Sequence, residues 1–228
     1  MSTLLPVVRT VKQAREYVGG FSAPSKMPGY AISTPAQRCI TGSKLREVEG
    51  SICFDCYAMG GRYCFHATQN AMERRYQALD LPDWVPNMIK GINNAEVFRW
   101  HDSGDLQSVE HLRNIALVAE GTPNTRHWIP TREYKFVRDY LKQYGEFPDN
   151  LCVRVSTHMI DGAPVAGFKN TSTVHKDGEA FGYSCPAKNQ GGKCDGPEFK
   201  YRGRAAPGPA PAPTHPHPHT RTRTHTPP

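Results

Sequence analysis

Short apolar runs and longer amphipathic stretches follow one another through the middle of this chain. The runs at 96–100, 127–129 and 151–155 indicate strands, and in the last of them apolar and polar residues alternate clearly. Between the runs, apolar side chains recur every three to four residues, which is typical of a helix with one buried face. The pattern therefore predicts strand, helix, strand, helix, strand over this region.

Turn and capping residues mark the ends of these elements. Ser108 is a good N-cap for a helix that Gly121 and Pro123 stop, and Gly145 ends the helix after it. Upstream, a first strand is expected at 30–33. Further helices are expected at 10–18, 65–79 and 84–92.

Strand–helix units repeated at intervals of roughly 25–30 residues are the signature of a parallel sheet. A full eight-fold barrel needs about 250 residues, more than the region offers. We therefore expect an α/β fold: an incomplete (βα) barrel or an open parallel sheet of about five to six βα units. It would occupy residues 30–200 as a single domain with cysteine-rich loops. Residues 1–29 would be an extension, and 201–228 a disordered low-complexity tail of Pro, Ala, Thr, His and Arg.

Charge and composition narrow the class of protein. The formal charge is +7, of which four arginines beyond residue 201 contribute +4, so the remaining chain is only mildly basic. This balance is compatible with a nucleotide or nucleic-acid partner. Because no apolar stretch approaches the roughly 20 residues of a membrane span, and the start lacks the apolar core of a secretory signal, we expect no membrane partner. The predicted location is the cytoplasm, that of the host if a phage encodes the protein.

The seven cysteines cluster, which favours metal-binding thiolates over a disulfide framework in a reducing compartment. Cys53 and Cys56 form a C-x-x-C pair in a glycine-punctuated loop, a spacing that lets two sulfurs bind one zinc ion or cluster iron. The alternatives for this pair are a redox dithiol and a zinc ion that only holds the loop together. The predicted metal ligands are Cys39, Cys53, Cys56, Cys185 and Cys194.

Polar clusters follow three of the predicted strands, at 101–105, 131–133 and 157–161. The carboxyl ends of parallel strands share one edge, which is where α/β enzymes place their chemistry. Carboxylates beside histidines serve in acid–base catalysis, and arginines such as Arg99, Arg132 and Arg154 bind phosphate. The alternative is that these residues only cap turns and form surface pairs. The catalytic candidates are His101, Asp102, Asp105, Arg132, Glu133 and His158.

Four segments together resemble the bacteriophage gene 88 product family of uncharacterised phage proteins. They are GSICFDCYA at 50–58, RWHDSGDL at 99–106, WIPTRE at 128–133, and CPAK at 185–188 with the Gln190–Cys194 stretch. The resemblance covers about residues 28–196. In topology the chain is also similar to radical S-adenosylmethionine enzymes, which hold an iron–sulfur cluster in the loop after the first strand of a partial barrel. That similarity implies S-adenosylmethionine as a cofactor, although Cys39 lies too far from Cys53 for the usual C-x3-C-x2-C spacing.

Three hypotheses of function follow. The leading one is a phage-type enzyme that depends on zinc or an iron–sulfur cluster and acts on a nucleotide or nucleic acid by an unknown reaction. The second is a zinc-containing base-exchange transglycosylase, with Asp102 or Asp105 as nucleophile. The third is a zinc-stapled module without catalytic activity that binds nucleic acid or protein.

Overall fold

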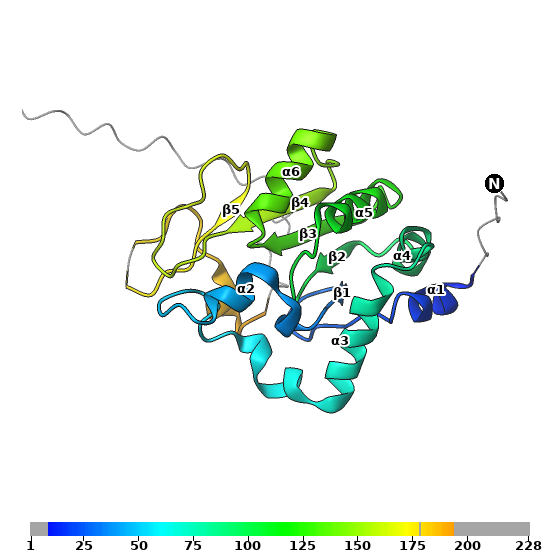
Figure 1. Ribbon diagram of the computed structural model, residues 1–228, viewed down its shortest axis with the longest axis horizontal. Helices are drawn as coiled ribbons and strands as arrows, with labels where there is room; N and C mark the ends of the chain where they lie inside the picture. The colour runs from blue at the N-terminus through cyan, green and yellow to red at the C-terminus, as the bar shows by residue number, and fades with distance from the viewer. Residues whose placement is uncertain (1–8, 178, 194–228) are drawn as a thin grey trace, which may run out of the picture.

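The computed structural model of the chain describes residues 9–177 and 179–193, and these form an α/β fold around a parallel sheet (Figure 1). In the described residues the sheet has five strands, all parallel. They are β1 (Tyr30–Ile32), β2 (Val97–Trp100), β3 (Arg126–Thr131), β4 (Leu151–Ser156) and β5 (Thr171–Ser172). The predicted parallel α/β architecture is confirmed.

Six α-helices connect and cover the strands in the same part of the chain. They are α1 (Val11–Tyr17), α2 (Ile40–Leu45), α3 (His66–Ala78), α4 (Trp84–Ile92), α5 (Val109–Glu120) and α6 (Tyr134–Tyr144). Single 3-10 turns lie at Ala36–Arg38, Tyr57–Met59, Gly61–Cys64 and Pro186–Gln190. Helix α1 packs on α4, α4 on α5, and α5 on α6.

The strands lie in the order β1-β2-β3-β4-β5, which is their order in the sequence. Crossovers between parallel strands are right-handed, so an order that never reverses keeps the connecting helices on one face of the sheet. Figure 1 shows α4, α5 and α6 side by side above the strands. All the carboxyl ends of the strands meet at one edge, close to α2 and the loop that follows it (Figure 1).

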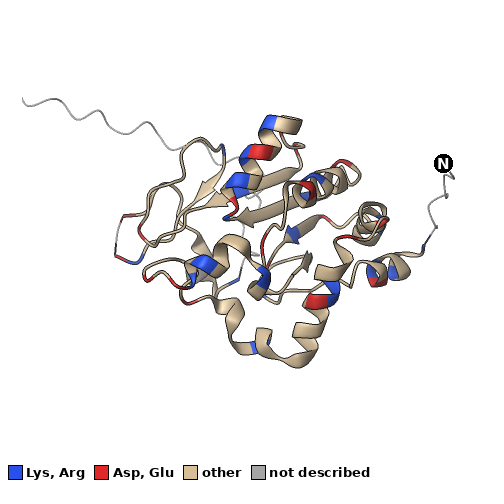
Figure 2. Cartoon of the chain, viewed as in Figure 1, with Lys and Arg blue, Asp and Glu red and all other residues tan. Residues whose placement is uncertain are grey.

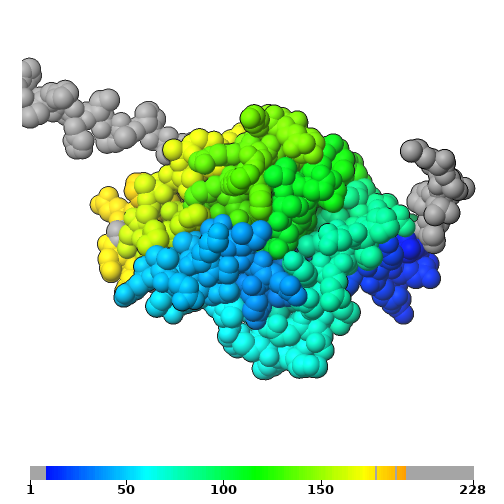
Figure 3. Space-filling view, in the orientation of Figure 1, coloured from blue at the N-terminus to red at the C-terminus, as the bar shows by residue number. Residues whose placement is uncertain are grey.

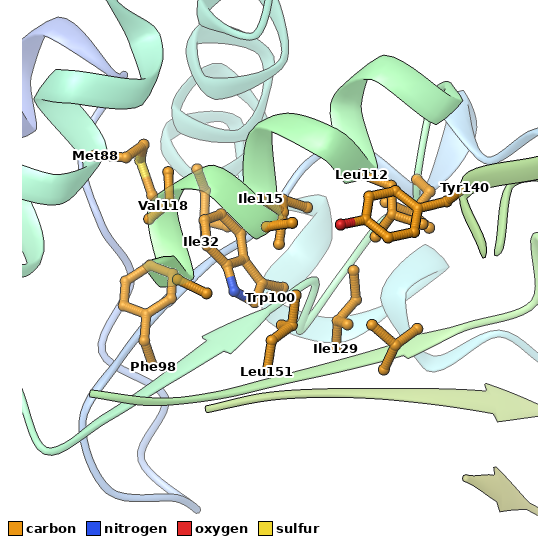
Figure 4. Packing of buried hydrophobic residues seen from close by; sticks show 14 of the residues in the cluster. Ile32, Met88, Phe98, Trp100, Leu112, Ile115, Val118, Ile129, Tyr140 and Leu151 are labelled. Carbon is orange, nitrogen blue, oxygen red and sulfur yellow. The ribbon is translucent and has the colours of Figure 1, made fainter. Parts of the chain in front are cut away.

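The core fills the space between this helical layer and the sheet (Figure 4). On β2, Phe98 and Trp100 are buried and point to the helices, whereas Val97 and Arg99 on the other face are half-buried. Ile129 continues the buried row on β3, and Leu112 and Ile115 of α5 pack above it. Burying side chains of this size stabilises the fold by about 1.5–3 kcal/mol each.

Local signals in the sequence define the helices as predicted. The Ser108 hydroxyl accepts a hydrogen bond from the His111 amide at 2.9 Å and so caps α5. Gly145 ends α6 with a φ of +81°, a backbone conformation that favours glycine. Helices α3 and α4 begin and end within one residue of the expected limits.

Other parts of the chain differ from the expected pattern or lie outside it. The apolar pattern fades after residue 170, yet Thr171–Ser172 pairs with β4, and α2 was not predicted. The predicted tail at 201–228 lies outside the described residues. Basic and acidic side chains are interspersed over the helices, without a block of one sign (Figure 2). No helix in the described chain is long and apolar enough to cross a bilayer.

Candidate functional site at the carboxyl edge of the sheet

The segment between β1 and α3, residues 39–65 and called here the cysteine loop, is attached to the carboxyl edge of the sheet at three points. The first is the segment that follows β4. There Ser51 bridges Met159, the Ile52 amide donates to the carbonyl of His158, and the Ile160 amide donates to the carbonyl of Gly50, both at 2.9 Å. These backbone hydrogen bonds fix the start of the C-x-x-C segment beside the end of β4.

The second attachment is Glu133, which follows β3. Its buried carboxylate accepts hydrogen bonds from the backbone amide and the hydroxyl of Thr41, each at 2.7 Å. Cys39 occupies the N-cap of α2 and makes no capping hydrogen bond with its side chain. Glu133 therefore satisfies an amide that the N-cap leaves without a partner, as a capping side chain would.

The third attachment is a pair of tyrosines. The hydroxyl of Tyr57 donates to the backbone carbonyl of Asp102, and the hydroxyl of Tyr63 reaches the same carbonyl at 3.5 Å. The two rings meet edge to face with centroids 5.7 Å apart. The far end of the cysteine loop is thereby fixed to the end of β2.

These attachments bring the thiols of Cys39, Cys53 and Cys56 together. A Cβ atom on Gly42 would lie 3.6 Å from the sulfurs of both Cys39 and Cys53, so these two thiols flank the same point. Burial is the main cause that raises the pKa of Cys39, to about 12, with the charges of Asp105, Cys56 and Cys53 adding to it. Burial also raises the pKa of Cys53, and the nearby Arg132 opposes that rise.

The other cysteines lie elsewhere or outside the described chain. Cys64 is exposed, and its sulfur contacts the carbonyl of Met59 at 3.2 Å. Cys152 is buried within β4, as expected of a small apolar side chain. Cys185 immediately precedes the 3-10 turn Pro186–Gln190 and is exposed, whereas Cys194 lies outside the described residues.

Among the residues that the structure describes, no three His, Cys, Asp or Glu side chains are arranged to hold a metal ion. The chemistry of the thiols nevertheless fits one, since zinc and iron–sulfur clusters both take thiolate ligands. In kind, Cys39, Cys53 and Cys56 form such a donor set.

Asp102 lies at this edge with two cations nearby. The Ser22 hydroxyl donates to its carboxylate at 3.4 Å. Burial raises the pKa of Asp102, and the positive charges of Arg99 and Arg75 oppose that rise. Neither arginine forms an ion pair with Asp102 in the described structure. Arg75 donates to the Ser33 hydroxyl at 2.7 Å and to the Gly20 carbonyl at 2.8 Å. Asp102 is thus a buried carboxylate that keeps acceptor capacity.

The carboxylate of Asp105 accepts more hydrogen bonds than that of Asp102. One of its oxygens accepts hydrogen bonds from the Thr131 hydroxyl at 2.6 Å and from the Leu106 amide at 2.8 Å. The other accepts from the Arg132 amide at 2.9 Å. Burial nevertheless raises the pKa of Asp105 to about 6, because it outweighs these hydrogen bonds. Asp105 connects the ends of β2 and β3, a structural task that the sequence could not separate from catalysis.

His101 follows β2 directly and is buried in an unusual backbone conformation, with a φ of +57°. Its ring lies 5.4 Å from that of His111, edge to face. Burial, with the charges of His111 and Arg99, lowers the pKa of His101 well below its ordinary value, so the ring is neutral. Neither ring nitrogen has a hydrogen-bond partner in the described structure.

Arg132 and His158 complete the candidate residues. The Nε2 atom of His158 donates to the carbonyl of Arg132 at 3.1 Å, and its ring stacks on Tyr134 with centroids 4.1 Å apart. His158 is therefore held in place by contacts to β3–α6. The Nε atom of Arg132 is buried and lacks a partner among the described residues.

Buried polar atoms without a partner gather at this edge. The described chain has seven such atoms. Five of them belong to four residues at or beside the ends of β1, β2 and β3: Thr34, Arg99, His101 and Arg132. A buried polar group left unpaired costs about 1–3 kcal/mol, so a cluster of them marks a place where a ligand or ordered water supplies the missing partners. Arg154, by contrast, donates to the Thr171 carbonyl at 2.9 Å.

Sequence reasoning found the edge but missed several of its members. Tyr57 and Tyr63 lie in the cysteine loop, and their aromatic character alone did not set them apart from core residues. Arg75 is buried within α3, a position that an arginine seldom takes, so its residue type gave no signal. Thr41 carried no signal in the sequence, because its partner Glu133 is 92 positions away.

Comparison with known proteins gave one match. Residues 8–208 match the model of a protein family described as Gene product 88. No curated protein and no solved structure matched the chain.

Proposed function

This chain belongs to the Gene product 88 family, a description that names no activity, and we propose from the site itself that it is a metal- or iron–sulfur-dependent enzyme. Its substrate would be a nucleotide or nucleic acid. The observation that carries the proposal is that the sulfurs of Cys39 and Cys53 flank one point at the carboxyl edge of the sheet. Besides burial, the charges of Cys56 and Asp105 raise the pKa of both thiols, so these groups lie nearby. Thiols confined to a structural role need not lie at the edge where parallel α/β proteins bind their ligands.

The metal would be held by the thiolates of Cys39, Cys53 and Cys56. A bound cation would reverse the electrostatics of this cluster, because it favours the deprotonated thiols that burial now disfavours. Three protein ligands leave a position open, as in catalytic zinc sites. When bound, zinc would act as a Lewis acid, and an iron–sulfur cluster would supply an electron, with S-adenosylmethionine as the co-substrate implied by the topology.

The chain's own residues would bind and orient the substrate. Arg99 and Arg132 each keep a buried Nε atom without a partner in the described chain, which suits a phosphate. Arg154 is less suitable, since its guanidinium already donates to a backbone carbonyl. Asp102, with its raised pKa, would exchange a proton with the substrate.

The sheet itself would be the wall of an incomplete barrel. Its strand order does not reverse, unlike that of a doubly wound sheet, and the helices cover one face. The opposite face carries half-buried side chains, including the stacked pair Arg99 and Trp128, with the guanidinium carbon 4.8 Å from the ring centroid. This face would line the interior and lead to the metal.

Two other functions make different predictions. In a base-exchange transglycosylase, Asp102 or Asp105 would be the nucleophile, and Asp102 suits the task better because all three hydrogen bonds of Asp105 serve the fold. In a zinc-stapled binding module, substitutions at the edge would leave binding unchanged, and removal of zinc would unfold the loop.

Metal analysis of anaerobically purified protein tests the proposal. We expect iron with sulfide and a broad visible absorption band, or about one equivalent of zinc without colour. Cys39→Ser, Cys53→Ser and Cys56→Ser should each lose the metal, whereas Cys64→Ser, the matched control at an exposed cysteine, should keep it. Wild-type protein that retains neither metal after anaerobic reconstitution contradicts the proposal.

A second measurement separates catalysis from structure. Asp102→Asn should keep both the fold and the metal, and should abolish turnover of the substrate, or its binding where turnover is not yet known. If Asp102→Asn instead unfolds the protein, or leaves the wild-type properties intact, the carboxylate has no catalytic role.

A further inference from the structure

Exposed apolar side chains are concentrated on the cysteine loop. Of the large hydrophobic residues that are exposed in the described chain, six belong to it: Ile40, Val48, Phe54, Tyr57, Met59 and Phe65. Three of these are aromatic, and Phe54 is 47% exposed, Tyr57 64% and Phe65 63%. Figure 3 shows this part of the chain, in pale blue, projecting at the surface next to the yellow segment that follows β4. Such a concentration marks a surface that contacts a ligand or partner.

Tyr57 is held in place by contacts to the end of β2 and to Tyr63. Its hydroxyl is bonded to the carbonyl of Asp102, and the edge of its ring meets Tyr63. The side chain is thus fixed at its inner end while most of its surface faces solvent. A ligand that stacks on a ring already held in place loses little side-chain entropy on binding.

Two arginines lie at the same edge of the sheet as this ring. Tyr57 is bonded to Asp102, which follows Arg99 of β2, and the Arg132 amide is bonded to Asp105. Burial, which dominates, and Asp102 raise the pKa of Tyr57, whereas both arginines lower it. The cysteine loop itself carries Lys44, Arg46 and Arg62 against Glu47, Glu49 and Asp55, so its own charges cancel. A ligand at Tyr57 therefore meets two arginines and the carboxylate of Asp102, and both arginines keep an unpartnered buried Nε in the described structure.

We propose that the aromatic side chains of the cysteine loop form a stacking surface for single-stranded nucleic acid, with one base on Tyr57 and the adjoining phosphates on Arg99 and Arg132. This inference rests on the proposed function, whose substrate class it narrows. Every base presents a π-face to an aromatic ring, so binding of this kind tolerates any sequence. Phe54 and Phe65 extend the surface beyond one base, which a free nucleotide would not use.

Other occupants fit the observations less well. The bases of a duplex are stacked on one another and cannot lie flat on Tyr57 without opening. A protein partner would cover the apolar side chains but would not require the unpartnered arginine Nε atoms at the same edge. The charge and the aromatic rings together favour a polymer that carries both bases and phosphates.

Fluorescence anisotropy with a labelled single strand of about 12 nucleotides tests the proposal on the full-length protein. Tyr57→Ala should weaken binding roughly 5- to 100-fold, the loss expected for one stacked base. Phe54→Ala and Phe65→Ala should each weaken it as well. Tyr144→Ala, which removes a half-exposed tyrosine from α6, is the matched control and should leave binding unchanged.

Two further arms define the ligand. Tyr57→Phe keeps the ring, so it should bind far better than Tyr57→Ala. Arg99→Gln should make the salt dependence shallower, because two phosphate contacts on a single strand give a slope of about −1.4 in a plot of log K against log salt concentration. Binding of a mononucleotide or a duplex as tight as that of the single strand would overturn the proposal.

Metal analysis distinguishes failure of the stacking surface from failure of the proposed metal-dependent function. Metal content measured on the same preparations should be equal in Phe54→Ala, Phe65→Ala and wild type, because neither phenylalanine makes one of the three attachments of the cysteine loop. If the protein holds its metal but the aromatic variants bind the strand like wild type, the stacking surface is wrong and the metal enzyme stands. If single strands bind through Tyr57 in a protein that holds no metal, the stacking surface stands and the metal-dependent function is wrong.

Discussion

At the scale of single residues, one glycine decides whether the edge of the sheet can form. Gly104 has a φ of +82°, and a Cβ atom there would lie 1.9 Å from the hydroxyl oxygen of Thr34 and 2.9 Å from its carbonyl oxygen. The Thr34 amide also donates to the Ser103 carbonyl, and the Ser103 hydroxyl donates to the Thr34 carbonyl, both at 3.0 Å. The loops after β1 and β2 are therefore in contact through a position that only glycine fits.

Gly104→Ala should consequently destabilise the protein by at least about 2 kcal/mol, since it adds a steric overlap to a strained backbone. Urea denaturation followed by circular dichroism measures this loss. Gly60→Ala is the control, because its φ is −139° and no atom lies within 4 Å of the added Cβ. It should change stability by less than about 0.5 kcal/mol, and equal losses at the two positions would refute the argument.

The same scale shows what the sequence reveals about individual side chains. The order of strands and polar clusters placed Asp102, Asp105 and Glu133 at one edge, and the structure has them there. The sequence pattern did not reveal that the carboxylates of Asp105 and Glu133 accept hydrogen bonds from backbone amides and threonine hydroxyls. Such partners lie far away in the sequence, so a carboxylate that ties loops together and one that performs chemistry look alike.

At the scale of elements, the cysteine loop depends on contacts with other segments. Helix α2 has only six residues and includes Gly42, and its N-cap Cys39 offers no capping hydrogen bond. A helix this short is not stable by itself. Its position therefore depends on Glu133 and on the backbone pairing of Ser51 with Met159.

A double-mutant cycle on Glu133 and Thr41 tests this dependence. Glu133→Gln should cost roughly 1–3 kcal/mol, since a neutral amide cannot accept both hydrogen bonds. Thr41→Val removes the hydroxyl and preserves the shape of the side chain. Because both changes break the same contact, the double variant should lose less than the sum of the single losses, as measured by urea denaturation. Strictly additive losses would show that the two residues do not act together.

The elements that the sequence predicted share a strong local signal. Helices α4 and α5 carry apolar stripes and recognisable ends, and β4 has apolar residues at every second position, although five of its six residues are buried. The elements that were missed lack such signals. Strand β5 consists of Thr171 and Ser172, which are half-buried and gain their structure by pairing with Val155 and Ser156. The structure of such segments depends on tertiary contacts, which no local sequence pattern indicates.

At the scale of the whole molecule, the strand–helix rhythm predicted a parallel sheet, and the five strands lie in sequence order. The strand–helix pattern could not predict how the chain connects β4 to β5. Residues 157–170, between β4 and β5, contain no helix, so the helical layer ends with α6. The rhythm also could not show that three histidines would be buried among the elements it predicted.

These histidines, His101, His111 and His127, make stability depend on pH. Burial lowers the pKa of all three, to about 4 for His111 and His127, from an ordinary value of 6.5. Below pH 6.5 the unfolded chain therefore takes up protons that the folded protein does not, and the free energy of unfolding falls as the pH falls toward 4. Asp102 and Asp105 act in the opposite sense, because burial raises the pKa of both carboxyl groups, that of Asp105 to about 6, but they are two groups against three.

We therefore expect the free energy of unfolding, measured with urea across a pH series, to fall by at least about 2 kcal/mol between pH 6.5 and about pH 4.5. His111→Asn tests the cause, because an asparagine oxygen can replace the Nδ1 atom that accepts a hydrogen bond from the Gln107 amide at 3.3 Å. The variant removes one titrating group, so its stability should vary less steeply with pH than that of the wild type. A slope that is unchanged in His111→Asn would assign the acid sensitivity to other groups, and a stability that rises toward pH 4.5 would mean that the carboxyl groups dominate.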